Sequence, residues 1–118
     1  MEKFTVELPL TGEYLTTVRL TTGGLCALAG FDVESTEDYK VCVTDSLLML
    51  KRNGFSRARL EFVSGETLAC RVGGLEQTGT RENALEDEIS RALLAALVGN
   101  VEFSSGEDGA LVAVAFEG

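Results

Sequence analysis

Hydrophobic and polar positions change their spacing along the chain, and these changes mark the expected secondary structure. Residues 3–8, KFTVEL, alternate apolar and polar side chains, which predicts a half-exposed strand that Pro9 ends. Apolar residues at helical spacing then predict a helix over residues 11–28. Gly23 and Gly24 lie inside this helix, where they mark either a break or a close backbone approach.

A second helix is expected over residues 35–52, with Ser35 as its N-cap and acidic residues in its first turn. Asn53-Gly54 ends it. A hairpin, a third helix and a second hairpin follow: strands at 57–63 and 67–72, a loop at 73–80, a helix at 82–98, and strands at 101–104 and 110–116.

The third helix carries apolar residues at helical spacing, and its acidic residues are interpreted as a solvated face. The apolar residues are Leu85, Ile89, Leu93 and Leu97, and the acidic ones are Glu82, Glu86, Asp87 and Glu88. The last strand, ALVAVAF, is apolar on both faces, so we expect it inside the sheet rather than at an edge.

The order β-α-α-β-β-α-β-β predicts the fold class. Helices that alternate with hairpins favour a two-layer α/β sandwich, with a mixed, mostly antiparallel five-stranded sheet and all three helices on one face. Neither a repeat nor a linker divides the sequence, so residues 1–118 are expected to form a single domain.

Composition narrows the class of protein. The 45% hydrophobic content is ordinary for a globular protein, and no apolar run approaches the roughly 20 residues that span a bilayer. The first residues lack the apolar region of a signal peptide, so we expect a cytoplasmic protein without a membrane segment. The formal net charge of −9 argues against a nucleic-acid partner, because phosphate binding needs clustered lysine and arginine.

The sequence contains no histidine, which removes Ser-His and Cys-His nucleophile systems and the usual metal sites. Cys26, Cys42 and Cys70 lie far apart among apolar residues, without the spacing of a zinc site or a disulfide framework. They are expected to be small buried hydrophobic residues, and no metal site is predicted.

Asp45 is the one acid in the apolar stretch VCVTDSLLML, residues 41–50. An ionised carboxylate among apolar neighbours costs several kcal/mol unless it is paired or lies at an edge. Lys40, Thr44 and Lys51 share a narrow stripe of the helix that should face water. Asp45 lies away from this stripe, either on a flank that the fold covers or on the wall of a cavity. Three interpretations stay open: a catalytic base, a paired structural acid, or part of a cleft for another ligand. Its pairing partner could be Lys40, Arg19, Arg71 or a backbone N–H.

Three stretches together resemble the serine-kinase anti-sigma factors of the GHKL (histidine-kinase-like) ATPase superfamily. VELPLTGEYLTTVRL is similar to the first strand and helix of that family, and GFDVESTEDYKVCVTDSLLMLKRNG to its nucleotide-binding helix. LEDEISRALLAALVGNVEFSSGEDGALVAVAF is similar to its last helix and strand pair. The resemblance implies a Bergerat-like fold, a sigma factor or anti-anti-sigma-like protein as partner, and a homodimer formed through the N-terminal strand and helix.

In that family, a glutamate of the nucleotide-binding helix activates the attacking hydroxyl, and an asparagine one turn later ligates Mg²⁺. The register places Asp45 and Met49 at these positions. An aspartate could still act as a general base, whereas a thioether is a soft ligand and Mg²⁺ prefers hard oxygen. Gly73 and Gly74 match glycines of the family's adenine loop, but its aspartate is missing. No glycine-rich phosphate turn precedes the last helix, where acids would repel a triphosphate.

The resemblance thus implies a vestigial nucleotide site formed by Asp45, Met49, Gly73 and Gly74, with no cofactor expected. The predicted function is a regulatory domain that binds a protein partner in a bacterial signalling switch and is not an enzyme. Two alternatives stay open. One is a divergent serine/threonine kinase that still uses ATP and Mg²⁺ with Asp45 as catalytic base, and the other is a small-ligand sensor that uses the vacated cleft.

Overall fold

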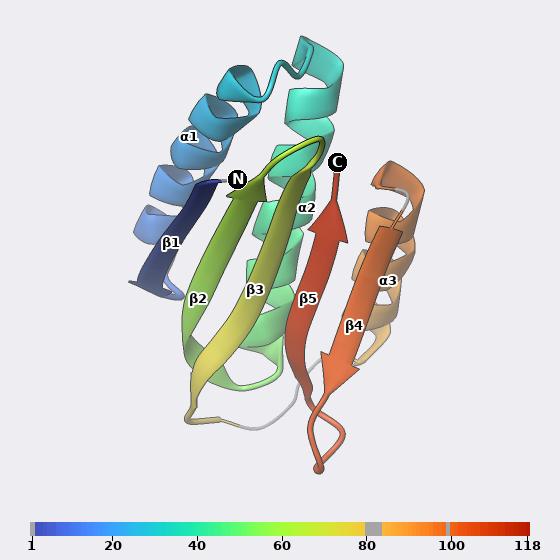
Figure 1. Ribbon diagram of the computed structural model, residues 1–118. Coiled ribbons are helices and arrows are strands. Elements are labelled where there is room, and N and C mark those ends of the chain that lie inside the picture. Colours follow the sequence, from blue (N-terminus) through green and yellow to red (C-terminus); the bar gives the residue numbers. More distant parts are fainter. Residues whose placement is uncertain (1, 80–83, 99) are drawn as a thin grey trace.

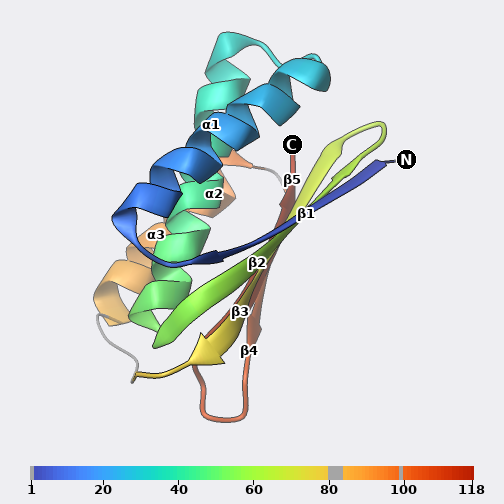
Figure 2. The same ribbon diagram turned by 90° about the vertical axis from the view of Figure 1, so that its left-hand side faces the viewer.

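The computed structural model describes residues 2–79, 84–98 and 100–118, which form two layers. A five-stranded sheet carries α1, α2 and α3 on one face, and none of the described residues forms a helix on its other face (Figures 1 and 2). In chain order the elements are β1 (Glu2–Pro9), α1 (Gly12–Leu28), α2 (Val33–Arg52), β2 (Phe55–Ser64), β3 (Leu68–Gln77), α3 (Ala84–Leu97), β4 (Asn100–Ser105) and β5 (Leu111–Glu117). The predicted sandwich is confirmed.

The strands follow the order β1-β2-β3-β5-β4, and each neighbouring pair is antiparallel. The predicted interior position of the last strand is confirmed, because β5 lies between β3 and β4. Val114 and Phe116 of β5 are buried against the helical layer together with Val72 of β3. Because β5 is paired along both edges, it exposes no free N–H or C=O groups that could pair with another chain. An uncharged, apolar strand is therefore tolerated at this position.

The predicted loop at residues 73–80 is wrong at its start, because β3 continues through Gly73 and Gly74 to Gln77. Gly73 pairs with Arg59, and Gly74 pairs with Ala58, so both glycines belong to the ladder between β2 and β3. A Cβ at residue 74 would overlap the ring of Phe55. The glycine is therefore explained by a close packing contact within a strand and not by a turn.

The predicted N-cap of α2 is also wrong. The helix begins at Val33, and Asp32 is its N-cap, with its Oδ1 accepting a hydrogen bond from the Ser35 N–H at 2.7 Å. This hydrogen bond from Ser35 lowers the pKa of the Asp32 carboxyl. The predicted end of α2 is confirmed, because Arg52 is its last residue and Asn53 is its C-cap.

Helix α1 is continuous through Gly23 and Gly24, so these glycines do not mark a break. The other predicted alternative, a close approach at the glycine pair, applies where α1 contacts α2. Lys40 of α2 lies against Gly23, with its Cε 2.8 Å from the position that a Cβ would take. The predicted water-facing stripe is therefore wrong in part: α1 leaves the Lys40 side chain only 22% exposed, and the Thr44 hydroxyl is buried. Lys51 is exposed as predicted.

The third helix turns an unexpected side toward the core. It buries Asp87, Ser90 and Leu94, so the interpretation of its acids as a solvated face is wrong for Asp87, which is 2% exposed. Leu85 and Ile89, in contrast, are exposed. The predicted start of this helix at Glu82 and its predicted stop at Gly99 lie outside the described residues.

The cysteine prediction is confirmed: Cys26, Cys42 and Cys70 are buried free thiols. Burial raises the pKa of Cys26 to about 11 and that of Cys42 to about 12. No helix among the residues that the structure describes combines the length and apolar character needed to span a membrane.

Candidate functional site

Asp45 lies half-buried on the side of α2 that faces α3. Burial raises the pKa of its carboxyl, while the positive charge of Arg52 and a hydrogen bond from Ser90 of α3 act in the opposite direction. None of the predicted partner side chains is among these neighbours. Arg52 follows Asp45 by seven residues, two helical turns, so helical periodicity could have identified it. Ser90 reaches Asp45 only through the tertiary contact of α2 with α3.

Arg52, Asn53, Asp87 and Ser90 form a polar network between the end of α2 and the start of α3. Arg52 Nε donates to Asp87 Oδ1 at 2.8 Å, and Arg52 Nη2 donates to Ser90 Oγ at 2.9 Å. Asn53 Nδ2 donates to the other carboxylate oxygen of Asp87 at 2.6 Å. Both oxygens of the buried Asp87 carboxylate are thus satisfied by donors, one of them charged, which is the condition under which a buried charge is tolerated.

Asn53 extends the polar network to the sheet. Its Oδ1 accepts a hydrogen bond from the Leu111 N–H at the start of β5 at 3.0 Å. Its Nδ2 also donates to the Met49 carbonyl at 2.7 Å, and its own carbonyl accepts from Gln77 Nε2 at 3.2 Å. The fully buried side-chain amide of Asn53 therefore joins α2 to α3 and β5, and the backbone carbonyl of the same residue joins it to the end of β3.

The four residues of the predicted nucleotide site lie in three different environments. Met49 is completely buried in the core, and Gly74 is covered by the Phe55 ring. Gly73 lines a cavity of about 290 Å³ with Arg59 and Arg71. Neither Asp45 nor Met49 contributes to this cavity. Within the described residues, this arrangement does not favour the predicted sensor cleft.

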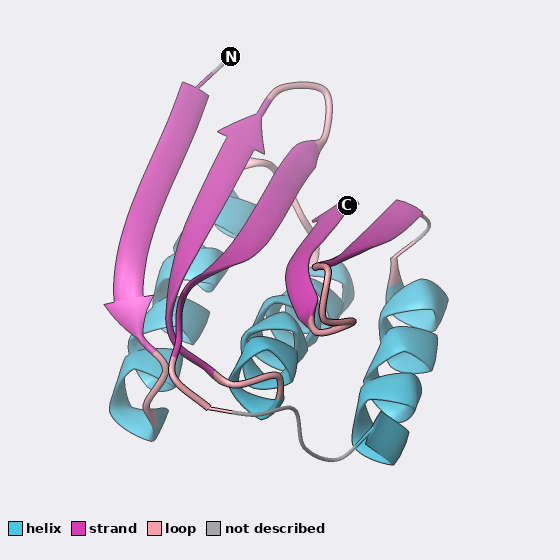
Figure 3. Ribbon diagram, turned by 90° about the horizontal axis from the view of Figure 1, so that it is seen from below, coloured by secondary structure: helices cyan, strands magenta, loops and turns pink. Residues whose placement is uncertain are grey.

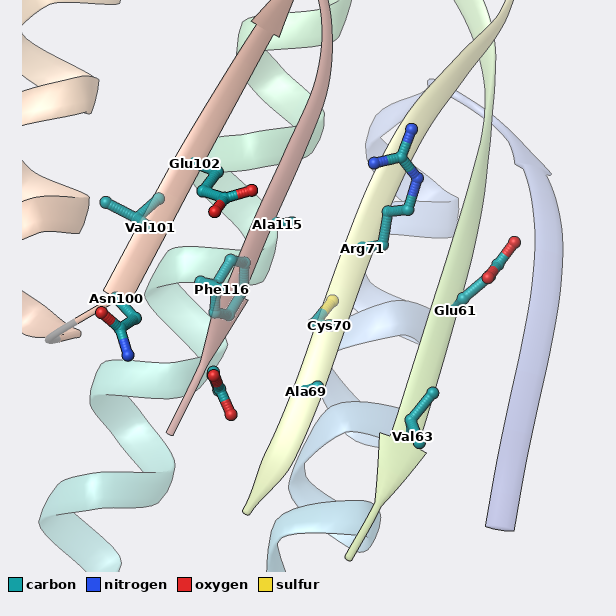
Figure 4. Close-up of a pocket in the computed structure, with 11 residues that line it drawn as sticks. Glu61, Val63, Ala69, Cys70, Arg71, Asn100, Val101, Glu102, Ala115 and Phe116 are labelled. Atoms are coloured by element: carbon teal, nitrogen blue, oxygen red, sulfur yellow. The ribbon is translucent and has the colours of Figure 1, made fainter. Parts of the chain in front are cut away.

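A broader cavity of about 710 Å³ lies over β2, β3, β5 and β4 (Figure 4). The small side chains of Ala69 and Ala115 leave this surface hollow, and Glu61, Arg71 and Glu102 stand around it. Asp45 is not part of it. In the described part of the chain no three histidine, cysteine or acidic side chains gather in a way that could hold a metal ion.

Comparison with known proteins shows a partial similarity to a serine-protein kinase. Over 54 residues the chain is 33% identical to the serine-protein kinase RsbW of Listeria monocytogenes and to that of Listeria innocua. The match covers 46% of this chain and 34% of each relative, so the chain matches about a third of the length of these curated proteins. No family model matches the chain.

By its name, this relative is a serine-protein kinase. The similarity agrees with the resemblance to serine-kinase anti-sigma factors that the sequence suggests. The antiparallel sheet with three helices on one face agrees with the fold that this resemblance implies.

Proposed function

We propose that this protein is a regulatory domain of the serine-kinase anti-sigma type that acts by binding a protein partner and no longer uses a nucleotide. The observation that carries the proposal is the polar network between α2 and α3. It holds the Asp87 carboxylate in the first turn of α3, the helix that a phosphate-binding turn would precede according to the resemblance. A carboxylate that is held so close to the helix N-terminus opposes the binding of a triphosphate there by charge.

Two further features support the loss of the nucleotide. Met49 stands at the register of the Mg²⁺ ligand, yet its side chain is buried in the hydrophobic core and offers only a soft sulfur atom. The Phe55 ring packs on Gly74, where the resemblance calls for a glycine that leaves room for the base. A methionine thus stands where the resemblance calls for the Mg²⁺ ligand, and a phenylalanine ring fills the space that the adenine base would need.

Partner binding finds support at the N-terminal edge of the sheet. In the described residues β1 pairs with β2 alone, so its outer edge is unpaired. An apolar cavity of about 220 Å³ separates β1 from α1, lined by Val6, Val18 and Phe62 among others. Phe4 and Tyr14 are exposed beside this region. A free strand edge with adjacent apolar surface suits the homodimer that the resemblance implies, or docking of a sigma factor or an anti-anti-sigma-like protein. Such a function is exercised in the cytoplasm.

Calorimetric titration of the purified protein with ATP and ADP, with and without Mg²⁺, tests the proposal. We expect no binding at millimolar nucleotide. The double variant Asp45→Glu with Met49→Asn restores the family's residues and serves as a comparison: if the site is lost, it also fails to bind. Binding of ATP to the wild type at micromolar strength would overturn the proposal.

A second candidate function is a divergent serine/threonine kinase, and the state of Asp45 favours it. Burial raises the pKa of its half-buried carboxyl, as a general base needs. By the resemblance, Asp45 also occupies the helix position of the glutamate that activates the attacking hydroxyl. This candidate predicts transfer of the γ-phosphoryl group of ATP to a protein serine in the presence of Mg²⁺. The transfer should disappear in Asp45→Asn, and its absence in the wild type would exclude this candidate.

A further inference from the structure

Five apolar residues line the outward side of α3, and we call this surface the α3 stripe. Leu85, Ile89 and Leu93 are spaced by one helical turn and are 69%, 60% and 39% exposed, which is unusual for large aliphatic side chains in a row. Ala92 and Ala96 complete the stripe and are also exposed. Figure 3 shows α3 at the border of the helical layer, with α2 on one side and no other described element on the opposite side.

The polar network keeps the α3 stripe turned outward. Asp87, Ser90 and Leu94 occupy the side of α3 that meets α2, and Asp87 is held there by Arg52 and Asn53. Rotating the helix to bury the stripe would pull the Asp87 carboxylate away from both donors and leave the Arg52 guanidinium without its buried partner. Losing one partner of a buried ion pair is strongly unfavourable, so no rotation of α3 within the described part of the chain covers the stripe, and a partner molecule could cover it.

The charges around the α3 stripe indicate what could cover it. Glu86 and Glu88 are exposed on its two sides, and Glu86, whose side chain is 60% exposed, also lies 3.8 Å from Arg52 Nη1. Arg91, in contrast, stacks its guanidinium 4.8 Å from the centre of the Phe103 ring, so its charge is directed at β4 and away from the stripe. The chain as a whole carries a formal charge of −9. A second copy would bring acidic residues against acidic residues, and an anionic membrane surface would be repelled, whereas a basic partner would be attracted.

We propose that the α3 stripe is a docking site for an amphipathic helix whose apolar face is bordered by lysine or arginine. Leu85 to Ala96 spans about 17 Å at 1.5 Å per residue, so about three turns of a partner helix would lie along it. Ridges formed by residues four apart on α3 would pack against similarly spaced apolar residues of the partner. Glu88 would then contact its basic residues, joined by Glu86 across its long contact with Arg52, and these contacts would favour a helix with basic borders over one with acidic borders. The surface is separate from the polar network, so this proposal does not rest on the loss of the nucleotide.

A display library of helical peptides tests the docking site without assuming one sequence. The peptides, about 18 residues or five turns long, keep leucine at helical spacing and vary the bordering positions among lysine, glutamate and glutamine. We expect selection on the full chain to enrich lysine at the borders. Fluorescence anisotropy of an enriched peptide should then show binding that Ile89→Ser weakens by at least about tenfold. Leu20→Ser is the matched control, because Leu20 is a 72% exposed leucine of α1, and its peptide affinity should equal that of the wild type.

Several outcomes would overturn the docking site. If the selection yields no binding peptide, the docking site is absent. If binding peptides show no preference at the bordering positions, or prefer glutamate there, the charge argument is contradicted. Equal binding to the wild type and to Ile89→Ser would place the contact elsewhere. If the wild type dimerises in sedimentation and Ile89→Ser does not, a second copy is the occupant. Urea unfolding of both variants shows that each retains the fold, since exposed substitutions change stability by only about 0.5 kcal/mol.

Discussion

Asn53 connects the end of α2 to two other elements through a single side chain that is completely buried. Its amide makes three hydrogen bonds, with the Met49 carbonyl, the Asp87 carboxylate and the Leu111 N–H, at 2.7, 2.6 and 3.0 Å. Asn53→Ala removes all three and leaves the Leu111 N–H buried without this acceptor. At a net value of about 0.5–1.5 kcal/mol per hydrogen bond, with about 1–3 kcal/mol for an unsatisfied buried group, the predicted loss of stability is about 2.5–7.5 kcal/mol.

The assay for this loss is urea unfolding followed by circular dichroism, with the free energy of unfolding extrapolated to water. Asn100→Ala is the control, because Asn100 is exposed at the start of β4 and its replacement should change stability by less than about 0.5 kcal/mol. A domain has only about 5–15 kcal/mol of stability in total, so the predicted effect is large. If Asn53→Ala costs under about 1 kcal/mol, the amide does not join these elements and the reasoning is refuted.

Three more predictions concern a carboxyl, a glycine and the thiols. Because burial raises the pKa of Asp45, the folded state favours the protonated carboxyl. The stability that this protonated carboxyl contributes is complete below the pKa of the unfolded state and is lost as the pH rises through the pKa of the folded state. Asp45→Asn should therefore be at least as stable as the wild type at pH 7 and show a flatter pH dependence above about pH 4 in urea unfolding; a clear loss at neutral pH would contradict this. Gly74→Ala should lose about 1–3 kcal/mol in thermal unfolding through overlap with Phe55, whereas Gly73→Ala, which has open space for a Cβ, is the control and should change little. The three buried cysteines should be inert to an aromatic disulfide reagent at pH 8 in the native protein and all react in urea, and rapid native labelling would contradict their burial.

Most of the fold could be predicted from the sequence because the signals are local. The period-two alternation of β1 and the helical spacing of α1 and α2 lie within short windows of the chain. The apolar run of β5 also indicated an interior strand, and β5 is indeed paired with β3 and β4 along its two edges, although helices cover only one face of the sheet in the described residues. The predicted boundaries were wrong where a single side chain determines the end of an element. The Asp32 carboxylate caps α2 three residues before the predicted N-cap, and Phe55 packs on Gly74 within the part of β3 that was predicted to be a loop.

The candidate site was predicted only in part. Helical register placed Asp45 on a covered flank of α2 or on a cavity wall, and the structure has it half-buried on the side of α2 that faces α3. It could not show that Asp87, within a run of acids, would be buried 35 positions after Arg52. It also could not show that Gly73 and Gly74 would face different surroundings, because both were expected in a loop.

The sequence by itself determined which elements form, their order and the residues that each helix can offer on either side. Only the tertiary structure decided which side of α3 is buried. The apolar spacing of Leu85, Ile89 and Leu93 suits a core face, yet the helix buries Asp87 and Ser90 instead. The physical reason is that Arg52 and Asn53 supply donors to both oxygens of Asp87, and hydrogen bonds between residues so far apart in the chain leave no periodic signal in it.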